Sequence, residues 1–198
     1  MRPTISKKVF VVTALTLPLL AQAHTGAGLD AHAHAEFLEG LAHPLTGLDH
    51  LAAMLTVGFW SALTARRIWL APLTFAAMLL AGALLGMTGL SVPGVEPMVA
   101  ASLLVLGLML ALRARLPATL AVAMIGVFAL FHGLAHGAVW MGGDQPWKPL
   151  LGMLAGTIVL HLSGLGLGLV VRERSLLWPR VVCAAVTLLG GALLLQMV

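Results

Sequence analysis

The stretch ATLAVAMIGVFALFHGLAHGAVW, residues 118–140, sets the class of this protein. It contains no Asp, Glu, Lys or Arg, and it is long enough for a helix to cross the hydrocarbon core of a bilayer, which takes about 20 apolar residues. It also carries His132 and His136, which share one face of such a helix because they are four residues apart. The stretch therefore predicts a membrane-spanning helix with two imidazoles on one side.

The composition of the whole chain also indicates a membrane protein. Of its 198 residues, 60% are hydrophobic and 9% are charged, whereas soluble domains are about half apolar and about a quarter charged. These proportions exclude a soluble globular protein. The single cysteine excludes a disulfide framework and paired-cysteine metal sites. The eight histidines, set against seven carboxylates, are the feature that a functional interpretation has to explain.

The N-terminus has the form of a secretory signal peptide. Three basic residues precede an apolar run at 9–20, and Ala21-Gln-Ala23 follows as a small-residue cleavage site. The run is shorter than the ~17 residues that a membrane span needs, which favours cleavage over an uncleaved first helix. We therefore expect residues 1–23 to be removed, His24 to become the first residue, and residues 24–40 to form a histidine-rich periplasmic segment.

Hydropathy and turn-forming residues divide the rest of the chain into membrane spans. We expect an all-α polytopic membrane helix bundle of six transmembrane helices within residues 41–198, at 41–63, 68–90, 97–112, 118–140, 150–171 and 181–198. Three spans followed by three of opposite orientation would also allow an inverted repeat.

The basic residues mark the orientation of these spans. Seven arginines lie in alternate loops and only Lys148 lies in the opposite set, so the positive-inside rule places the arginine-bearing loops in the cytoplasm. The chain is therefore expected in the bacterial inner membrane with its mature N-terminus in the periplasm. Its net charge of +4 reflects this topology and not nucleic-acid binding.

The first span brings a second pair of histidines to the same side of the membrane. On an ideal helix His43 and His50 lie about 20° apart, whereas Asp49 lies about 120° from His43 and about 100° from His50. Asp49 can join the site if the helix is distorted near Gly47, or it can orient a histidine from outside the ligand set. Because span 41–63 runs inward and span 118–140 runs outward, both histidine pairs fall in the outer half of the membrane.

His161 lies near the middle of the span 150–171. Ionisable groups at membrane depth cost free energy, so a functional role is the default interpretation, although a hydrogen bond in a packed bundle would also account for a lone buried histidine. Imidazoles with one carboxylate suit divalent nickel, cobalt, copper or zinc better than magnesium or calcium. Spacing alone therefore predicts a site for a divalent first-row transition metal without choosing among these ions.

Two motifs carry a resemblance to a known family. The sequence His43-Pro-Leu-Thr-Gly-Leu-Asp49-His50 resembles the H-x5-D-H signature of the HupE/UreJ nickel and cobalt permeases, and FHGLAHG at 131–137 resembles their F-H-G-x-A-H-G signature. The resemblance covers essentially the whole mature chain. It implies uptake of Ni²⁺ or Co²⁺ for nickel enzymes such as hydrogenase or urease. It assigns the metal to His43, Asp49, His50, His132 and His136.

One position departs from the family pattern. Members of the family usually have a glutamate two residues after the last glycine of the second motif, where this chain has Val139. Loss of this carboxylate could weaken metal affinity or change metal choice, or Glu96 or Asp144 in nearby outer loops could replace it.

The expected function is secondary transport and not catalysis. Outer histidines and acids, with His24 at the N-terminus, would gather the ion, which would then bind His50, His132 and His136 and pass His161 toward the cytoplasm. The sequence has no Walker A motif for ATP hydrolysis, so membrane potential is the expected driving force. No cofactor is expected.

The partners expected are the metal ion, the lipid bilayer and, indirectly, the machinery that matures nickel enzymes, and a homo-oligomer is compatible with the pattern. Two other functions stay open. Histidines on facing helices could bind haem in a membrane electron carrier, and histidine-held zinc could activate water in a membrane-embedded hydrolase, with Asp49 as the base.

Overall fold

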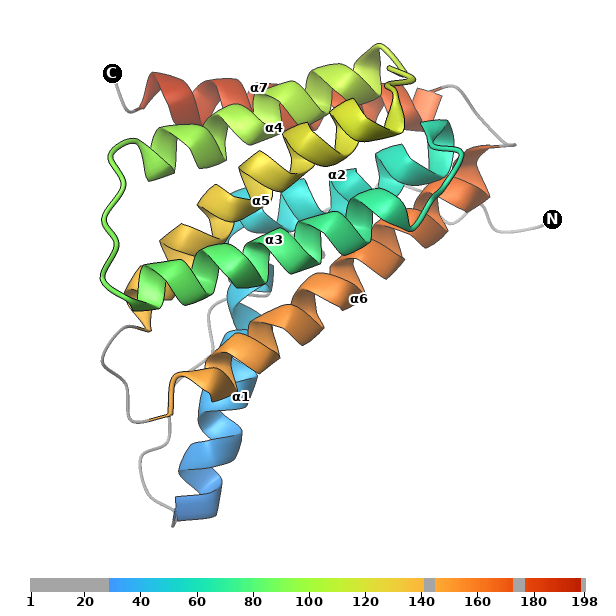
Figure 1. Ribbon diagram of the computed structural model, residues 1–198. Coiled ribbons are helices and arrows are strands. Elements are labelled where there is room, and N and C mark those ends of the chain that lie inside the picture. The colour runs from blue at the N-terminus through green and yellow to red at the C-terminus, as the bar shows by residue number, and fades with distance from the viewer. Residues whose placement is uncertain (1–28, 141–144, 173–176, 197–198) are drawn as a thin grey trace, which may run out of the picture. The chain divides into compact units, whose positions relative to one another are not determined.

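The computed structural model describes residues 29–140, 145–172 and 177–196, and the secondary structure within them is entirely helical (Figure 1). Residues 33–198 form one compact unit. The helices are α1 (Leu29–Thr46), α2 (Leu48–Thr64), α3 (Leu70–Met87), α4 (Val95–Ala111), α5 (Ala118–Val139), α6 (Trp147–Arg172) and α7 (Leu177–Leu195). The prediction of an all-α protein is confirmed. The predicted signal peptide, residues 1–23, and His24 lie outside the described residues.

Three of these helices, α3, α5 and α6, are long and apolar enough to cross a membrane. Helix α4 and residues 180–195 of α7 are apolar but shorter. Large apolar side chains on the long helices are exposed, for example Leu73 on α3 at 64% and Val170 on α6 at 59%. Exposed apolar surface of this kind marks contact with a membrane or a partner. The membrane character of the chain is thus supported, and the count of six spans stays a prediction.

The predicted first span, 41–63, is not one helix. Helix α1 ends at Thr46 and α2 begins at Leu48, because the backbone of Gly47 between them is extended, with φ −83° and ψ 112°. Pro44 weakens the last turn of α1, since proline has no N–H to donate within the helix. The chain therefore changes direction just before Asp49 and His50, and the angles of an ideal helix do not apply there.

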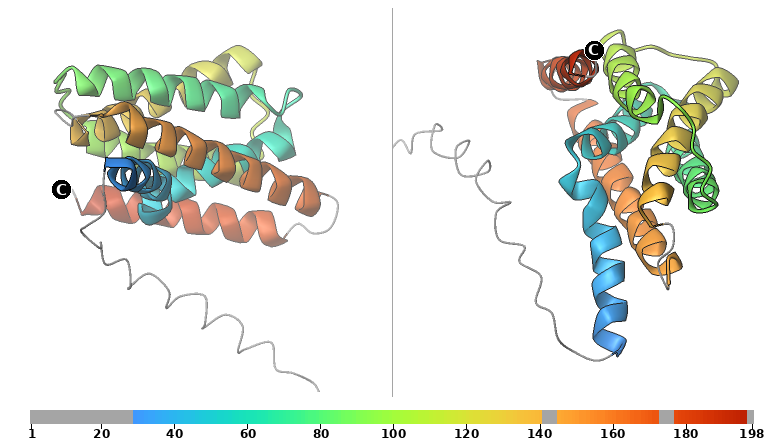
Figure 2. Two further views of the ribbon diagram at one scale, coloured as in Figure 1. Left: turned by 90° about the horizontal axis from the view of Figure 1, so that it is seen from below. Right: turned by 90° about the vertical axis from the view of Figure 1, so that its left-hand side faces the viewer.

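Glycine governs how the helices pack in pairs. Helix α3 packs most extensively against α5, α2 against α6, and α4 against α7 (Figures 1 and 2). At each contact a Cβ atom on glycine would overlap atoms of the neighbouring helix, so the backbones approach closely, as small residues allow in membrane proteins. These glycines are Gly82, Gly86, Gly133 and Gly137 between α3 and α5, Gly58, Gly164 and Gly168 between α2 and α6, and Gly107 and Gly190 between α4 and α7. Gly133 and Gly137 of the second motif thus lie directly against the backbone of α3.

The same contacts give the relative directions of the helices. Gly82 meets Leu130 and Gly86 meets Leu134, so α3 and α5 run parallel. The residue numbers of the contacts between α2 and α6 also increase together, so these two helices are parallel. Those of the contacts between α4 and α7 change in opposite directions, so these two helices are antiparallel. Two of the three tight pairs are therefore parallel and join helices that are not neighbours in the sequence.

This pairing has the form that an inverted repeat of three helices produces. Exchanging α2, α3 and α4 with α5, α6 and α7 converts the α2–α6 pair into α5–α3 and maps the α4–α7 pair onto itself. Gly82 and Gly86 of α3 then correspond to Gly164 and Gly168 of α6, which have the same spacing and the same role in a parallel contact. Inverted repeats of this kind are common in secondary transporters.

The interior between the helix pairs is mostly apolar. Phe75, Leu79, Met54 and Leu103 are among its fully buried side chains. The buried polar side chains within the described residues are Thr56, Ser61, Ser102, His132, His136, Thr157 and His161. Histidine is thus the largest polar side chain in the core, and its hydrogen-bond partners have to come from the bundle itself.

Replacing Gly82 by alanine should destabilise the protein. The added methyl group overlaps the backbone carbonyl of Leu130, and overpacking of this kind costs roughly 1–3 kcal/mol. Thermal unfolding of the purified protein, followed by circular dichroism, should therefore show a lower midpoint.

Gly166→Ala is the matched control, because a Cβ atom there meets nothing within 4 Å and alanine is favoured over glycine in a helix. Its midpoint should equal or exceed that of the wild type. A Gly82→Ala protein as stable as the wild type would contradict the glycine contact between α3 and α5.

Candidate functional site

Four of the predicted histidines come together in one cluster, which we call the imidazole cluster: His43 on α1, His50 on α2, and His132 and His136 on α5. The ring centroid of His50 lies 4.2 Å from that of His136 and 4.7 Å from that of His132, and the His43 centroid lies 4.7 Å from that of His136. The exposed fractions of His132 and His136 are 0% and 2%. Helices α2 and α5 are not among the extensively packed pairs, and His50 contacts His132 and His136 across the space between them.

Asp49 fixes the orientation of His50. The Nδ1–H of His50 donates to Asp49 Oδ1 at 2.8 Å, and the same oxygen accepts the backbone N–H of His50 at 2.8 Å. An ionised carboxylate only accepts hydrogen bonds, so Nδ1 of His50 carries a proton, and in the neutral imidazole the lone pair is then on Nε2. Asp49 lies in the first turn of α2, where the helix dipole favours a negative charge. Of the two roles predicted for Asp49, the geometry matches the orienting one.

Gly47 leaves room for this pair. A Cβ atom on Gly47 would lie 2.9 Å from Asp49 Oδ1 and 3.2 Å from His50 Nδ1. A side chain at this position would therefore push on both atoms of the hydrogen bond. The glycine of the first motif thus ends α1 and also keeps space for the Asp49–His50 contact.

Ser102 on α4 orients His132 through a hydrogen bond, as Asp49 orients His50. The Ser102 hydroxyl donates its only proton to the carbonyl of Val99 at 2.6 Å, and its oxygen lies 2.9 Å from His132 Nε2. The hydroxyl must therefore accept from His132, so that Nε2 carries the proton and Nδ1 keeps the lone pair. Both side chains are fully buried. The hydrogen bond consequently fixes one tautomer of His132.

Trp140 borders the cluster one helical turn after His136. Its ring is stacked on His136, at 5.8 Å between centroids and 13° between planes, and lies 5.5 Å from the ring of His43. Trp140 is itself buried. The cluster thus has an aromatic wall that contacts two of its four imidazoles.

Three ring nitrogens of the cluster are buried without a hydrogen-bond partner among the described residues: His50 Nε2, His132 Nδ1 and His136 Nε2. Buried polar atoms are nearly always paired, so three unpaired nitrogens in one cluster indicate atoms that bind something else. The rings touch one another, and within residues 29–140, 145–172 and 177–196 no three His, Cys, Asp or Glu side chains already form a metal-binding arrangement. The cluster therefore gathers unpaired imidazole nitrogens without forming a preformed cage.

His161 on α6 is separate from the cluster. Its Nδ1–H donates to the Met54 carbonyl at 2.8 Å, and its buried Nε2 has no partner in the described part of the chain. The packed-bundle explanation therefore accounts for one of its two nitrogens. Phe75 on α3 contacts both regions, since its centroid lies 5.6 Å from that of His132 and 5.0 Å from that of His161.

A cavity of about 320 Å³ borders the imidazole cluster. Its lining includes His43, Asp49, His50 and His136, together with Glu96 from α4 and Val139 from the end of α5. Val139 is 65% exposed. Of the two carboxylates considered as replacements for the missing glutamate, Glu96 therefore reaches the same cavity as Val139. Asp144 lies outside the described residues.

Sequence reasoning missed Ser102, Phe75 and Trp140. Ser102 had a detectable signal, because a serine inside the apolar run of α4 needs a buried partner. Trp140 stands one turn beyond the second motif and so on the same face as His136. Phe75 has no such signal, since the sequence does not distinguish a phenylalanine in an apolar helix from any other core residue.

Comparisons with known proteins agree on one family. The chain matches the family described as HupE / UreJ protein over residues 12–193. It is 38% identical to Protein HupE of Rhizobium leguminosarum bv. viciae over 191 residues, which cover 96% of this chain and 97% of that protein. No solved structure matches the chain.

Replacing Ser102 by alanine should destabilise the protein through His132. The buried Nε2–H of His132 loses its acceptor, which costs roughly 1–3 kcal/mol in the free energy of unfolding measured with denaturant. Ser163→Ala is the control, because Ser163 is exposed and bonds only the Val159 carbonyl.

A double-mutant cycle separates this effect from lost packing. In a His132→Leu background the cost of Ser102→Ala should be smaller by roughly 0.5–3 kcal/mol, the interaction energy found for residues in direct contact. An equal cost in both backgrounds would show that the hydrogen bond between Ser102 and His132 contributes nothing.

Proposed function

Because the chain belongs to the HupE/UreJ family, we propose that it is a secondary transporter that carries Ni²⁺ or Co²⁺ from the periplasm to the cytoplasm. The family is associated with nickel and cobalt transport and consists of transport and accessory proteins, not enzymes. The observation that supports the proposal best is the set of three buried, unpaired imidazole nitrogens in one cluster. The proposal places the protein in the bacterial inner membrane with a periplasmic N-terminus.

The ligand chemistry suits a divalent transition metal. Neutral imidazole nitrogens with lone pairs bind nickel and cobalt well, whereas magnesium and calcium require more oxygen ligands. His50 and His132 present their lone pairs because Asp49 and Ser102 hold the opposite nitrogens, as partners of metal-binding histidines commonly do. Asp49 also adds one negative charge beside the ion. In this proposal His43, His50, His132 and His136 hold the metal and Asp49 orients and neutralises.

The arrangement suits passage of an ion more than its storage. A conducted ion has to bind well enough to enter and weakly enough to leave, and the cluster has ligand atoms without a preformed cage. From the cluster the ion would pass Phe75 and meet the free Nε2 of His161. His24, at the proposed mature N-terminus, would serve as an outer ligand.

The driving force would be the membrane potential. An inside-negative potential favours entry of a divalent cation by roughly 4–5 kcal/mol per 100 mV. The inverted-repeat pairing of the helices provides two similar halves that could move against each other around a site between α2 and α5. Delivery to the maturation machinery of nickel enzymes would follow in the cytoplasm.

The haem alternative fits this geometry poorly. Two histidines that ligate one haem iron stand on opposite faces of the porphyrin, whereas the imidazoles of α2 and α5 are in direct contact, at 4.2 and 4.7 Å between centroids. The hydrolase alternative is set aside because the family is not one of enzymes.

Removing one unpaired nitrogen should abolish most metal uptake. We expect His50→Ala and His132→Ala each to lower the uptake of radiolabelled Ni²⁺ or Co²⁺ by cells at least about tenfold, the size of effect seen when metal-site residues are lost. Ser163→Ala, which changes an exposed side chain on α6, should transport like the wild type.

Protein levels in the membrane are compared by immunoblot. Wild-type uptake in both histidine variants at equal levels would refute the imidazole cluster as the path. Preferential uptake of Zn²⁺ over Ni²⁺ by the wild type would refute the choice of metal.

Glu96 should supply the carboxylate that Val139 does not. We expect Glu96→Gln to weaken Ni²⁺ binding roughly tenfold and Val139→Glu to restore it in that background, because both side chains line the cavity beside His136. The signal is quenching of Trp140, whose ring is stacked on His136, and Trp140→Phe defines the background from the other tryptophans.

Val139→Gln is the matched control for the rescue, since it adds the same bulk without the charge. Identical Ni²⁺ titrations of Glu96→Gln and wild type would contradict the role of Glu96. Rescue by Val139→Gln as well would show that size and not charge matters at this position.

A further inference from the structure

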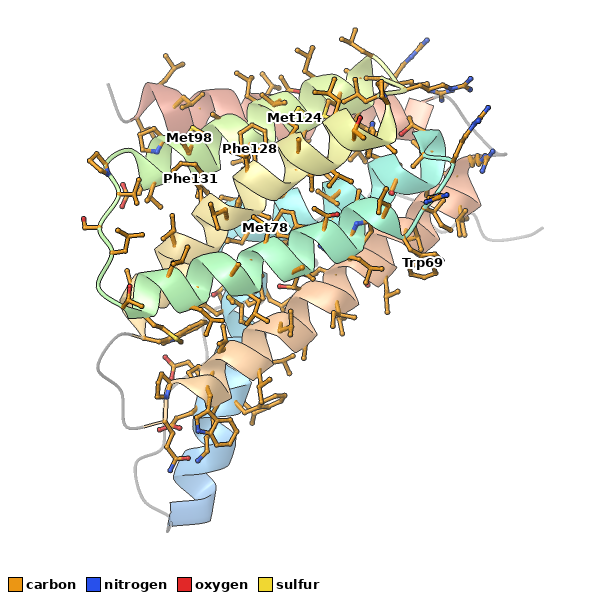
Figure 3. All side chains as sticks on the ribbon, viewed as in Figure 1. Trp69, Met78, Met98, Met124, Phe128 and Phe131 are labelled. Carbon is orange, nitrogen blue, oxygen red and sulfur yellow. The ribbon has the colours of Figure 1, made fainter. Side chains whose placement is uncertain are left out.

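A second and larger cavity, of about 670 Å³, lies at the opposite end of the bundle from the imidazole cluster. It sits where α2 and α4 end and α3 and α5 begin, and three of its lining residues are Arg66, Arg67 and Arg115. Figure 3 labels Trp69 at this end and Met98 at the other, and nitrogen-tipped side chains project beside Trp69. We call this cavity the arginine pocket.

The two loops that carry these arginines are tied to the end of α2. The indole N–H of Trp60 donates to the Ala114 carbonyl at 3.1 Å, one residue before Arg115. The Ser61 hydroxyl donates to the Ile68 carbonyl at 2.9 Å, one residue after Arg67. Arg113 also holds a left-handed backbone conformation, with φ 47°, which residues other than glycine adopt only when their surroundings enforce it. The pocket is therefore a defined structure at the junction of two pinned loops.

The arginines and the apolar wall of the pocket suit two different parts of one ligand. Among the residues that the structure describes, none of the three arginines has an acidic side chain within ion-pair distance. The wall beneath them is apolar and includes the buried Trp60, Ala71 and Ala121. Three unneutralised guanidinium groups repel a metal cation, so the pocket does not continue the proposed ion path. Guanidinium groups bind phosphate well, in bidentate geometry.

We propose that the arginine pocket binds the phosphate headgroup of an anionic phospholipid, whose acyl chains lie along the apolar wall. Basic pockets between helices at the cytoplasmic border of a membrane recognise such headgroups. The apolar wall can contact acyl chains, whereas it contributes nothing to the binding of free phosphate. The proposal does not depend on metal transport, because none of its residues belongs to the imidazole cluster.

The test uses the full-length protein, purified in detergent and stripped of lipid, and measures its thermal stability as phosphatidylglycerol, phosphatidylcholine or inorganic phosphate is added. Phosphatidylglycerol should raise the unfolding midpoint saturably, and the other two should not. The variant Arg66→Gln/Arg67→Gln/Arg115→Gln should need about a hundredfold more phosphatidylglycerol or should lose the response. Arg113→Gln removes one positive charge from the loop of Arg115 but outside the pocket, so it is the matched control for Arg115→Gln and should respond like the wild type. Arg115→Gln alone replaces the triple variant if that variant does not fold.

Each other outcome overturns the proposal. An equal response to inorganic phosphate would identify a site for the free anion, and an equal response to phosphatidylcholine would show contact with the acyl chains alone. An unchanged response of the pocket variants, or an equal loss with Arg113→Gln, would assign the effect to general surface charge. His50→Ala should keep the full lipid response, so failure of the transport proposal and failure of this one are distinguished.

Discussion

Lipid tails are as apolar as leucine, so membrane helices gain little by burying leucine against each other, and close backbone contact has to hold a bundle together. In this chain glycine makes that contact in each of the three tight helix pairs. The position of the imidazoles depends on it. Gly133 and Gly137 place one face of α5 against α3, and the neighbouring face, with His132 and His136, is thereby turned toward α2 and α4. The glycines of the second motif are thus as necessary to the site as its histidines.

The buried histidines follow one rule with three different partners. A carboxylate holds His50, a hydroxyl holds His132 and a main-chain carbonyl holds His161, and each of these groups accepts a proton from one ring nitrogen. In every case the other nitrogen is left with a lone pair in a buried position. In the neutral form, imidazoles held in this way keep an unpaired nitrogen in the bundle without a net positive charge, which is costly in an apolar interior.

Much of the fold and of the candidate site was predictable, because the helical period gives the positions of residues around a regular helix. The helix at 118–140, the glycine contact at Gly133 and Gly137, and the meeting of the two motifs all follow from the regular turn of α5. The sequence indicated the break at Gly47 only as one of two possibilities, because a helix that contains Pro44 and Gly47 can either bend or end there. The partnership of Ser102 with His132 depends on how α4 packs against α5, which spacing along one helix does not encode. The match of Asp49 to His50 likewise arises from the break and not from an ideal helical wheel.

The parallel helix pairs also constrain how the chain is assembled during synthesis. Helix α3 can find α5 as soon as the single intervening helix has been made, but α2 has to wait for α6, the fourth helix after it. Until α6 has been made, the glycine face of α2 lacks the helix against which it packs. The carbonyl of Met54 likewise lacks the imidazole that donates a hydrogen bond to it. Long waits between contacting segments slow folding and favour intermediates. A nascent chain therefore can form the α3–α5 pair first, the α2–α6 pair once α6 has been made, and the α4–α7 pair last.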